Sequence, residues 1–307
     1  MKCRPTVGGQ AIIEGVMMRN GAQMALAVRQ PNGEIAVEHQ QVISLTEKYP
    51  LLKKPILRGM VALGEALIYG MKALTTSAQL SGTEEEELSD REMTMTMVVA
   101  ILFAIALFIV LPTFVIKYLK EFMDNLILLN LAEGLLRLAI FLGYVVAISQ
   151  MNDIKRVFEY HGAEHKTIHA FEAGVPLDVE HVRQYTTLHP RCGTSFLLIV
   201  MMVSMMVFTF LGWPNIWQRI ISRIVLMPVI AGISYEIIRY AGRNAQASYM
   251  SWVIKPGLLL QKFTTREPDD SQIEVAIKAL EAVLPPENQE SQETQDEQPL
   301  TDKQQEN

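Results

Sequence analysis

Two long stretches without a charged residue constrain the fold of this chain more than any other feature. Residues 93–116 contain none over 24 positions, and residues 192–218 contain none over 27. About 20 apolar residues suffice to cross a bilayer as a helix. Residues 126–149 and 219–240 are of similar length and carry a few charges. We therefore expect an α-helical integral membrane protein with about four transmembrane helices, arranged as two hairpins.

The charges within the last two stretches need partners if these stretches cross a membrane. Glu133 and Arg137 are four residues apart, so they can pair on one helix face and lower the cost of immersion. Residues 219–240 carry Arg223 near the start and Glu236 and Arg239 near the end. The alternative for both stretches is a buried helix of a soluble domain.

Basic residues predict the orientation in the membrane. Four spans place both termini and the loop of residues 150–191 on one side. That loop carries five Lys and Arg residues, whereas the loop between the first two spans carries only Lys117 and Lys120. Because basic loops stay inside, we expect a multi-pass protein of the cell membrane with both termini and this loop in the cytoplasm.

The remaining chain divides into three parts. Residues 1–50 are predicted to be a β-rich cytoplasmic region, with one strand over residues 8–19 and a hairpin around Pro31-Asn32-Gly33. Residues 51–92 read as an amphipathic helix followed by an acidic linker at residues 84–87. A membrane domain over residues 93–266 precedes an acidic tail, 267–307, with twelve carboxylates and two lysines. We expect a short helix over residues 271–284 and disorder after it.

The loop of residues 150–191 holds the densest cluster of metal-ligand residue types. On an α-helix, which turns by about 100° per residue, these residues share one face. They are His161, Glu164, His165, His169 and Glu172. Two His at i and i+4 can bind one divalent ion, and a nearby Glu can deprotonate a water on it. The alternative is a membrane-surface helix with scattered His residues.

Three motifs carry a family resemblance. They are the segments 8–19 (GGQAIIEGVMMR), 160–167 (YHGAEHKT) and 189–196 (HPRCGTSF). In this order they resemble the YqhQ family of uncharacterised bacterial integral membrane proteins, over roughly residues 2–262. The resemblance implies a metal-dependent membrane protein of bacteria and leaves its substrate open.

The H-x-x-E-H pattern of residues 161–165 also resembles that of inverzincin peptidases. That resemblance implies His161 and His165 as zinc ligands, Glu164 as general base, and a third ligand from a later helix, for which Glu236 is the candidate. Pairing with Arg239 is the alternative role of Glu236. Weaker candidates for ligands are His169, Glu172, His189 and Cys192.

Two functions remain open from the sequence. The first is a divalent-metal-dependent, peptidase-like hydrolase at the cytoplasmic membrane face, with zinc as the expected ion. The second is a non-enzymatic membrane assembly or sensing factor with a structural metal site. Metal transport needs ligands deep in the spans, where only Glu133 and Glu236 qualify. The expected partners are the lipid bilayer and a membrane or cytoplasmic protein, and no nucleic acid.

Overall fold

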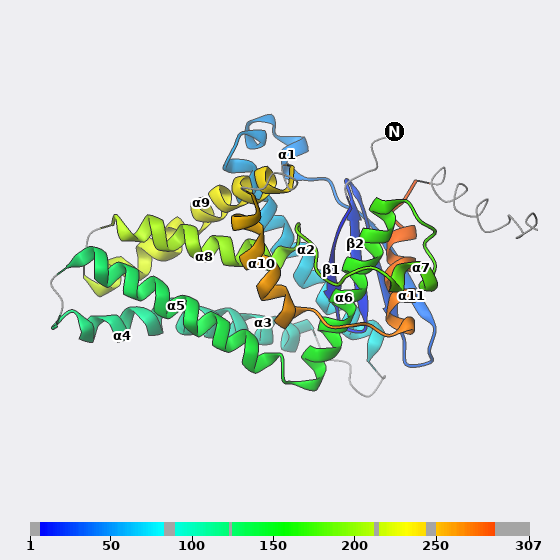
Figure 1. The fold of residues 1–307 in the computed structure, drawn as a ribbon, viewed down its shortest axis with the longest axis horizontal. Helices are drawn as coiled ribbons and strands as arrows, with labels where there is room; N and C mark the ends of the chain where they lie inside the picture. Colours follow the sequence, from blue (N-terminus) through cyan, green and yellow to red (C-terminus); the bar gives the residue numbers. More distant parts are fainter. Residues whose placement is uncertain (1–6, 83–89, 123–124, 212–214, 244–249, 286–307) are drawn as a thin grey trace, which may run out of the picture.

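The computed structural model describes residues 7–82, 90–122, 125–211, 215–243 and 250–285. It consists of an elongated helical bundle joined at one end to a small α/β unit (Figure 1). The predicted acidic linker at residues 84–87 and the predicted disordered tail from residue 286 onward lie outside the described residues.

A four-stranded antiparallel sheet forms the centre of the α/β unit. Its strands follow in the order β1 (Gly8–Ile12), β2 (Gly15–Asn20), β3 (Gln23–Arg29) and β4 (Ile35–Gln41). The predicted hairpin around Asn32-Gly33 joins β3 to β4. The prediction of one strand over residues 8–19 was wrong, because the chain reverses at Glu14, whose φ is 51°. Gly15 then packs so closely on β3 that a Cβ would collide with the carbonyl oxygen of Ala27.

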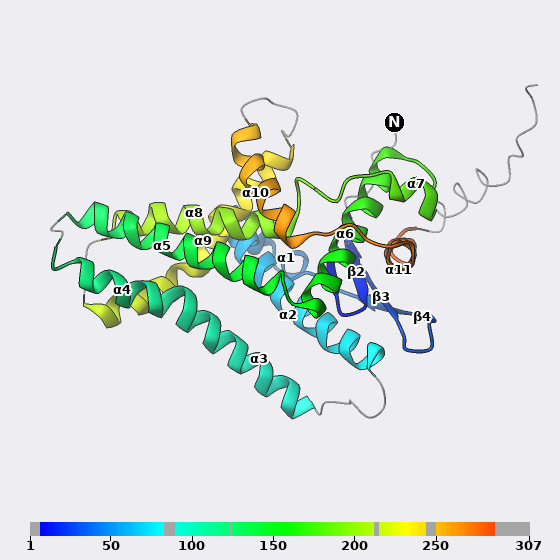
Figure 2. The ribbon, with the colours of Figure 1, turned by 60° about the horizontal axis from the view of Figure 1, so that its bottom comes forward.

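Both faces of the sheet are covered by helices. Because strand side chains alternate, Val16 and Ala27 face one side and Met17 and Leu26 face the other. The first side packs against α6 (Asn152–Ala173) and α11 (Asp270–Glu281), as Figure 2 shows. The second side packs against α2 (Leu57–Ser81). The α/β unit is therefore assembled from segments at the start, middle and end of the chain.

Helix α11 extends the folded unit into the acidic region. Its N-cap is Asp269, which forms a capping box with Gln272, and its apolar residues, such as Ile273 and Leu280, are fully buried against the sheet and α6. This confirms the predicted helix near residues 271–284. The folded chain therefore continues to about residue 285 rather than ending at residue 266.

Among the described residues, the bundle contains three helices that are long and apolar enough to cross a membrane. They are Thr94–Leu119, Leu126–Ile148 and Ile216–Gly242. The first comprises α3 (Asp90–Ile105), a π-helical turn η3 (Ala106–Val110) and α4 (Leu111–Leu119), the second is α5 (Leu126–Ile148), and the third lies in α9 (Ile216–Arg243). The predicted span at residues 192–218 is instead a shorter apolar helix, α8 (Gly193–Thr209). It ends at Thr209, and the next helix, α9, begins at Ile216.

The carboxylate of Glu133 forms ion pairs with three arginines inside the bundle. The predicted pairing with Arg137 is present, with Nη2 3.0 Å from the carboxylate. Arg223 Nη2 lies 2.7 Å from the same carboxylate, and Arg219 forms a third ion pair with it. Arg137 Nε also donates to the carbonyl oxygen of Phe108 at 2.8 Å, within the π-helical turn. This network ties α5, α9 and the first apolar helix together.

Four further helices complete the described part of the fold. They are α1 (Leu45–Lys48), the 3-10 helix η1 (Pro50–Lys53), α7 (Val179–Arg183) and α10 (Ser251–Thr264). Helix α10 packs against α8, where Gly257 lies so close to Ser195 that a Cβ would be 2.6 Å from the serine Cβ. The chain leaving α10 then crosses α6 on its way to α11.

Candidate metal centre

The His-rich sequence forms the middle of α6, a helix of 22 residues that ends at Gly174 in a left-handed conformation. The helical periodicity therefore holds, and His161, His165 and His169 share the face that looks toward residues 187–192. Those residues form the connection between α7 and α8. This places the two sequence motifs, 160–167 and 189–196, in direct contact.

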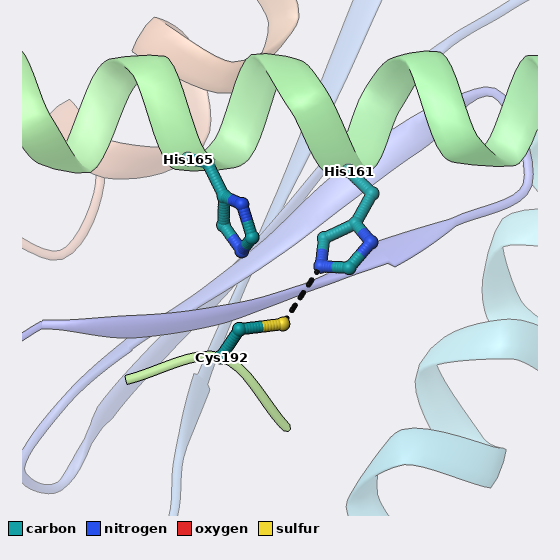
Figure 3. Close-up of side chains that lie close together, drawn as sticks. All are labelled: His161, His165 and Cys192. Atoms are coloured by element: carbon teal, nitrogen blue, oxygen red, sulfur yellow. Dashed lines mark hydrogen bonds between the residues drawn. The ribbon is translucent and has the colours of Figure 1, made fainter. Parts of the chain in front are cut away.

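Three potential ligands converge between α6 and the start of α8. The ligand atoms of His161, His165 and Cys192 all lie within 4.8 Å of one another. Figure 3 shows both imidazoles turned toward the sulfur, and His161 Nε2 is 3.2 Å from Cys192 Sγ. In a tetrahedral zinc site, a ligand nitrogen and sulfur are about 3.5 Å apart. The set therefore fits one small divalent ion with modest rearrangement.

Backbone carbonyls orient both imidazoles. His161 Nδ1 is 2.7 Å from the carbonyl oxygen of Thr264, and His165 Nδ1 is 2.5 Å from that of Thr187. A carbonyl only accepts, so each Nδ1 carries the proton and each Nε2 keeps its lone pair. This is the arrangement in which a metal-binding His is usually held by its second shell.

A glycine allows the Thr264 carbonyl to reach His161. The chain after α10 runs against α6, where Arg266 N donates to the carbonyl oxygen of Phe158 at 2.9 Å. At Gly162 a side chain would collide with the backbone oxygen of Arg266. The glycine inside the H-G-A-E-H sequence therefore has a packing role.

Cys192 occupies the N-cap of α8, and its Sγ accepts from Thr194 N at 3.4 Å. Burial raises the pKa of the thiol, but the adjacent His165 and Thr194 outweigh burial and lower it below the usual value. Burial also lowers the pKa of His165. A neutral imidazole and a thiolate are the forms that bind a metal, so both shifts favour ligation.

Glu164 lies beside this group, in contact with the sheet. Its side chain is buried, and a Cβ on Gly9 of β1 would be 2.8 Å from Glu164 Oε1. Within the described part of the chain, its carboxylate has no hydrogen-bond or ion-pair partner. Burial raises its pKa to about 7, despite a lowering effect of His161. A carboxyl group with this pKa can exchange a proton near neutral pH.

Glu236 is not brought to this group, which corrects the expectation that it supplies the third ligand. Its carboxylate accepts from Arg58 Nε at 2.6 Å and pairs with Nη2 of the same arginine. The alternative pairing with Arg239 is also not the one formed. Cys192, a weaker candidate from sequence, lies beside His161 and His165 instead.

The other weaker candidates form a second group in which each side chain already has a partner in the protein. His169, Glu172 and His189 have ligand atoms within 4.8 Å of one another. Glu172, however, forms an ion pair with Arg191, and His189 Nδ1 accepts from Arg191 N at 3.3 Å. His169 Nε2 lies 2.9 Å from the carbonyl oxygen of Leu188. These contacts account for the group without an ion.

Comparison with known proteins assigns the family. A family described as "Protein of unknown function (DUF1385)" matches residues 54–286. The chain belongs to this family. The chain is also similar to "Uncharacterized protein YqhQ" of Bacillus subtilis (strain 168), with 35% identity over 306 residues, which cover 92% of this chain and 93% of the relative. This supports the resemblance to the YqhQ family. No solved structure matches the chain.

Sequence reasoning missed the parts of the centre that depend on tertiary contacts. The carbonyls of Thr187 and Thr264 have no side-chain signal that could have revealed them. Gly9 and Gly162 were visible as glycines inside otherwise regular elements, which is a known signal of close packing. Cys192 was identified only as one of the weaker ligand candidates.

Proposed function

We propose that this protein is a divalent-metal-dependent hydrolase of the bacterial cell membrane, with zinc as its ion. The observation that carries the proposal is the convergence of His161 Nε2, His165 Nε2 and Cys192 Sγ, with both Nδ1 atoms already engaged by carbonyls. Three nitrogen and sulfur ligands with a fourth position left over are typical of catalytic zinc, whereas structural zinc has four protein ligands.

Glu164 is the proposed general base. It adjoins the ligand group without being a member of it, and its pKa of about 7 suits proton transfer at cellular pH. When bound, a zinc ion supplies Lewis-acid polarisation of a carbonyl or phosphoryl oxygen and activates water. Glu164 would hold and pass on the proton, while Gly9 leaves the space that its carboxyl group occupies.

The proposed location is the cytoplasmic face, with both termini on that side. In Figures 1 and 2, the ends of α4 and α8 and the starts of α5 and α9 lie at the end of the bundle remote from the sheet. This arrangement agrees with four passes if α8 also crosses, at about 25 Å for 17 residues. Basic residues are enriched on the cytoplasmic side of membrane proteins, so the basic residues of α6, which packs on the sheet, then support a cytoplasmic location for this end of the protein.

Metal analysis and a base variant test this proposal. The full chain, purified in mild detergent, is expected to contain about one zinc per molecule. Glu164→Gln should keep that zinc and lose the cellular function in a complementation assay, by about 10²-fold or more if activity is measured. A zinc-free wild-type protein under conditions where added zinc also fails to bind would contradict the metal assignment.

A second candidate is a non-enzymatic membrane assembly or sensing factor with a structural ion. The burial of the ligands favours it, because the exposed fraction is 1% for His165 and 6% for Cys192. Under this alternative, Glu164→Gln complements fully while still binding zinc, so the same experiment separates the two candidates.

A further inference from the structure

A basic cavity of about 560 Å³ lies between α2, the end of α9 and residues 44–53, away from the His-rich helix. Four cationic side chains line it, from Arg19, Lys53, Arg58 and Arg239. The carboxylate on its wall belongs to Glu65. A cavity with this lining attracts an anion.

The ion pairs leave part of this positive charge uncompensated. Arg58 pairs with Glu236, and Arg19 lies 3.6 Å from the carboxylate of Glu65. Glu65 also accepts from Ser44 Oγ and Leu45 N, at 2.8 Å each. Among the described residues, neither Lys53 nor Arg239 has a carboxylate partner. The cavity wall therefore carries about two positive charges that the carboxylates of Glu65 and Glu236 do not neutralise.

An apolar cavity of about 500 Å³ lies on the other side of the Arg58–Glu236 pair. Its lining is mostly aliphatic: Ile56, Ile233, Ile237, Ala241 and Met250. Arg58 lines the basic cavity and Glu236 lines the apolar one, so the two cavities adjoin at this ion pair. Together the two cavities place a positively charged region next to an apolar one.

The crossing of α2 and α9 beside the two cavities is tight. A Cβ on Gly59 of α2 would be 2.9 Å from the Cα of Gly232 of α9. Next to this contact, Ile56 adopts a φ of 69°, in the left-handed region that a β-branched residue rarely enters. Such strain persists where the surrounding structure enforces it, and it concentrates at ligand sites.

The surroundings of the basic cavity suit the membrane interface. The segment before α2 exposes large apolar side chains, with exposed fractions of 68% for Ile43 and 61% for Leu51. The apolar part of α9 ends at Gly242, close to Arg239 and the exposed Tyr240. Aromatic and basic residues at the end of a span are typical of the headgroup level.

We propose that the two cavities form one binding site for an anionic phospholipid. The phosphate of its headgroup binds Lys53 and Arg239 in the basic cavity, and an acyl chain lies against Ile233 and Ile237 in the apolar one. A lipid can occupy both cavities at once, whereas a free phosphate or a soluble phosphate ester can occupy only the basic one. Basic pockets between helices on the cytoplasmic side bind lipid headgroups in this manner.

A lipid titration of the full chain tests the site. The protein, purified in neutral detergent, is titrated with phosphatidylglycerol, phosphatidylcholine, glycerol phosphate or inorganic phosphate, and binding is followed by native mass spectrometry and by Tm. Saturable binding and a raised Tm are expected with phosphatidylglycerol alone. Each basic residue near a membrane surface contributes about fivefold in affinity, so Lys53→Gln/Arg239→Gln should weaken binding about 25-fold.

Matched variants separate this site from general attraction to charge. Lys72→Gln/Lys262→Gln removes the same charge at exposed positions that do not line the cavities, and should bind like the wild type. Ala241→Leu fills part of the apolar cavity and should weaken phosphatidylglycerol binding. Equal effects of the two double variants, or equal binding of phosphatidylcholine, would overturn the proposal. A response to inorganic phosphate as strong as that to the lipid would overturn the lipid assignment.

Discussion

Gly9 of β1 lies directly against the carboxyl group of Glu164 on α6. A Cβ at Gly9 would be 2.8 Å from Glu164 Oε1 and 2.9 Å from the backbone oxygen of Met17. The first neighbour can move because it ends a flexible side chain, but the second belongs to the sheet. An N-terminal strand and a helix some 150 residues later thus share one contact at the candidate centre.

Gly9→Ala should therefore displace the Glu164 carboxyl group without removing any ligand. We expect zinc content near that of the wild type and a clear loss of cellular function. The neighbouring Gly8 is a matched control, because a Cβ there would meet nothing within 4 Å. Metal analysis and complementation of both alanine variants check this, and equal complementation by the two would contradict a functional role for the contact.

The elements of the fold were largely predictable because local patterns determine them. Uncharged stretches identified the apolar helices, and Asn32-Gly33 identified the hairpin between β3 and β4. The packing of these elements was not predictable in the same way. The burial of α11 against the sheet brings residues such as Ile273 and Val16, more than 250 positions apart, into one hydrophobic cluster. No local pattern reports such a contact.

The candidate site likewise combines residues that a local sequence pattern predicts with residues that only tertiary contacts bring there. His161 and His165 lie one helical turn apart, so periodicity alone placed them together. Cys192 reaches them only because α7 and the chain after it fold back along α6. Glu236 was expected there because the inverzincin resemblance implies a third ligand from a later helix, but the structure pairs its carboxylate with Arg58. Arg58 lies 178 residues away on α2.

The ligand assignment predicts which substitutions remove zinc. His161→Ala, His165→Ala and Cys192→Ala should each lose most of the bound ion, because two remaining ligands hold it poorly. Glu236→Ala should retain it, since that side chain pairs with Arg58. His169→Ala serves as a second control on the same helix face. Zinc loss in His169→Ala together with retention in Cys192→Ala would place the ion in the other His group.

The arginine cluster in the bundle predicts a large loss of stability when its carboxylate is removed. Glu133→Gln leaves Arg137, Arg219 and Arg223 without their shared counter-charge in a buried site. Breaking a buried ion pair costs about 3–5 kcal/mol, so the free energy of unfolding should fall by about that amount. Glu180→Gln, at an exposed position of α7, should change it little. Thermal unfolding in detergent checks the difference.

The raised pKa of Glu164 predicts a pH dependence of stability in the metal-free protein. Burial moves the pKa of this carboxyl group from 4.5 to about 7 in the folded state. Between these values the folded protein binds a proton that the unfolded chain has lost, so stability falls as pH rises from about 4.5 to 7. The full shift corresponds to about 3 kcal/mol.

Glu164→Gln removes this contribution and serves as the reference. His165, whose pKa is lowered by burial, acts in the opposite direction, because its unfolded form binds the extra proton. The raw profile therefore mixes the two effects, whereas the difference between wild type and Glu164→Gln isolates the carboxyl group. In chelator-treated protein, the Tm of the wild type should drop relative to the variant by several degrees between pH 5 and about 7.5. Parallel profiles would show that Glu164 does not titrate in this range.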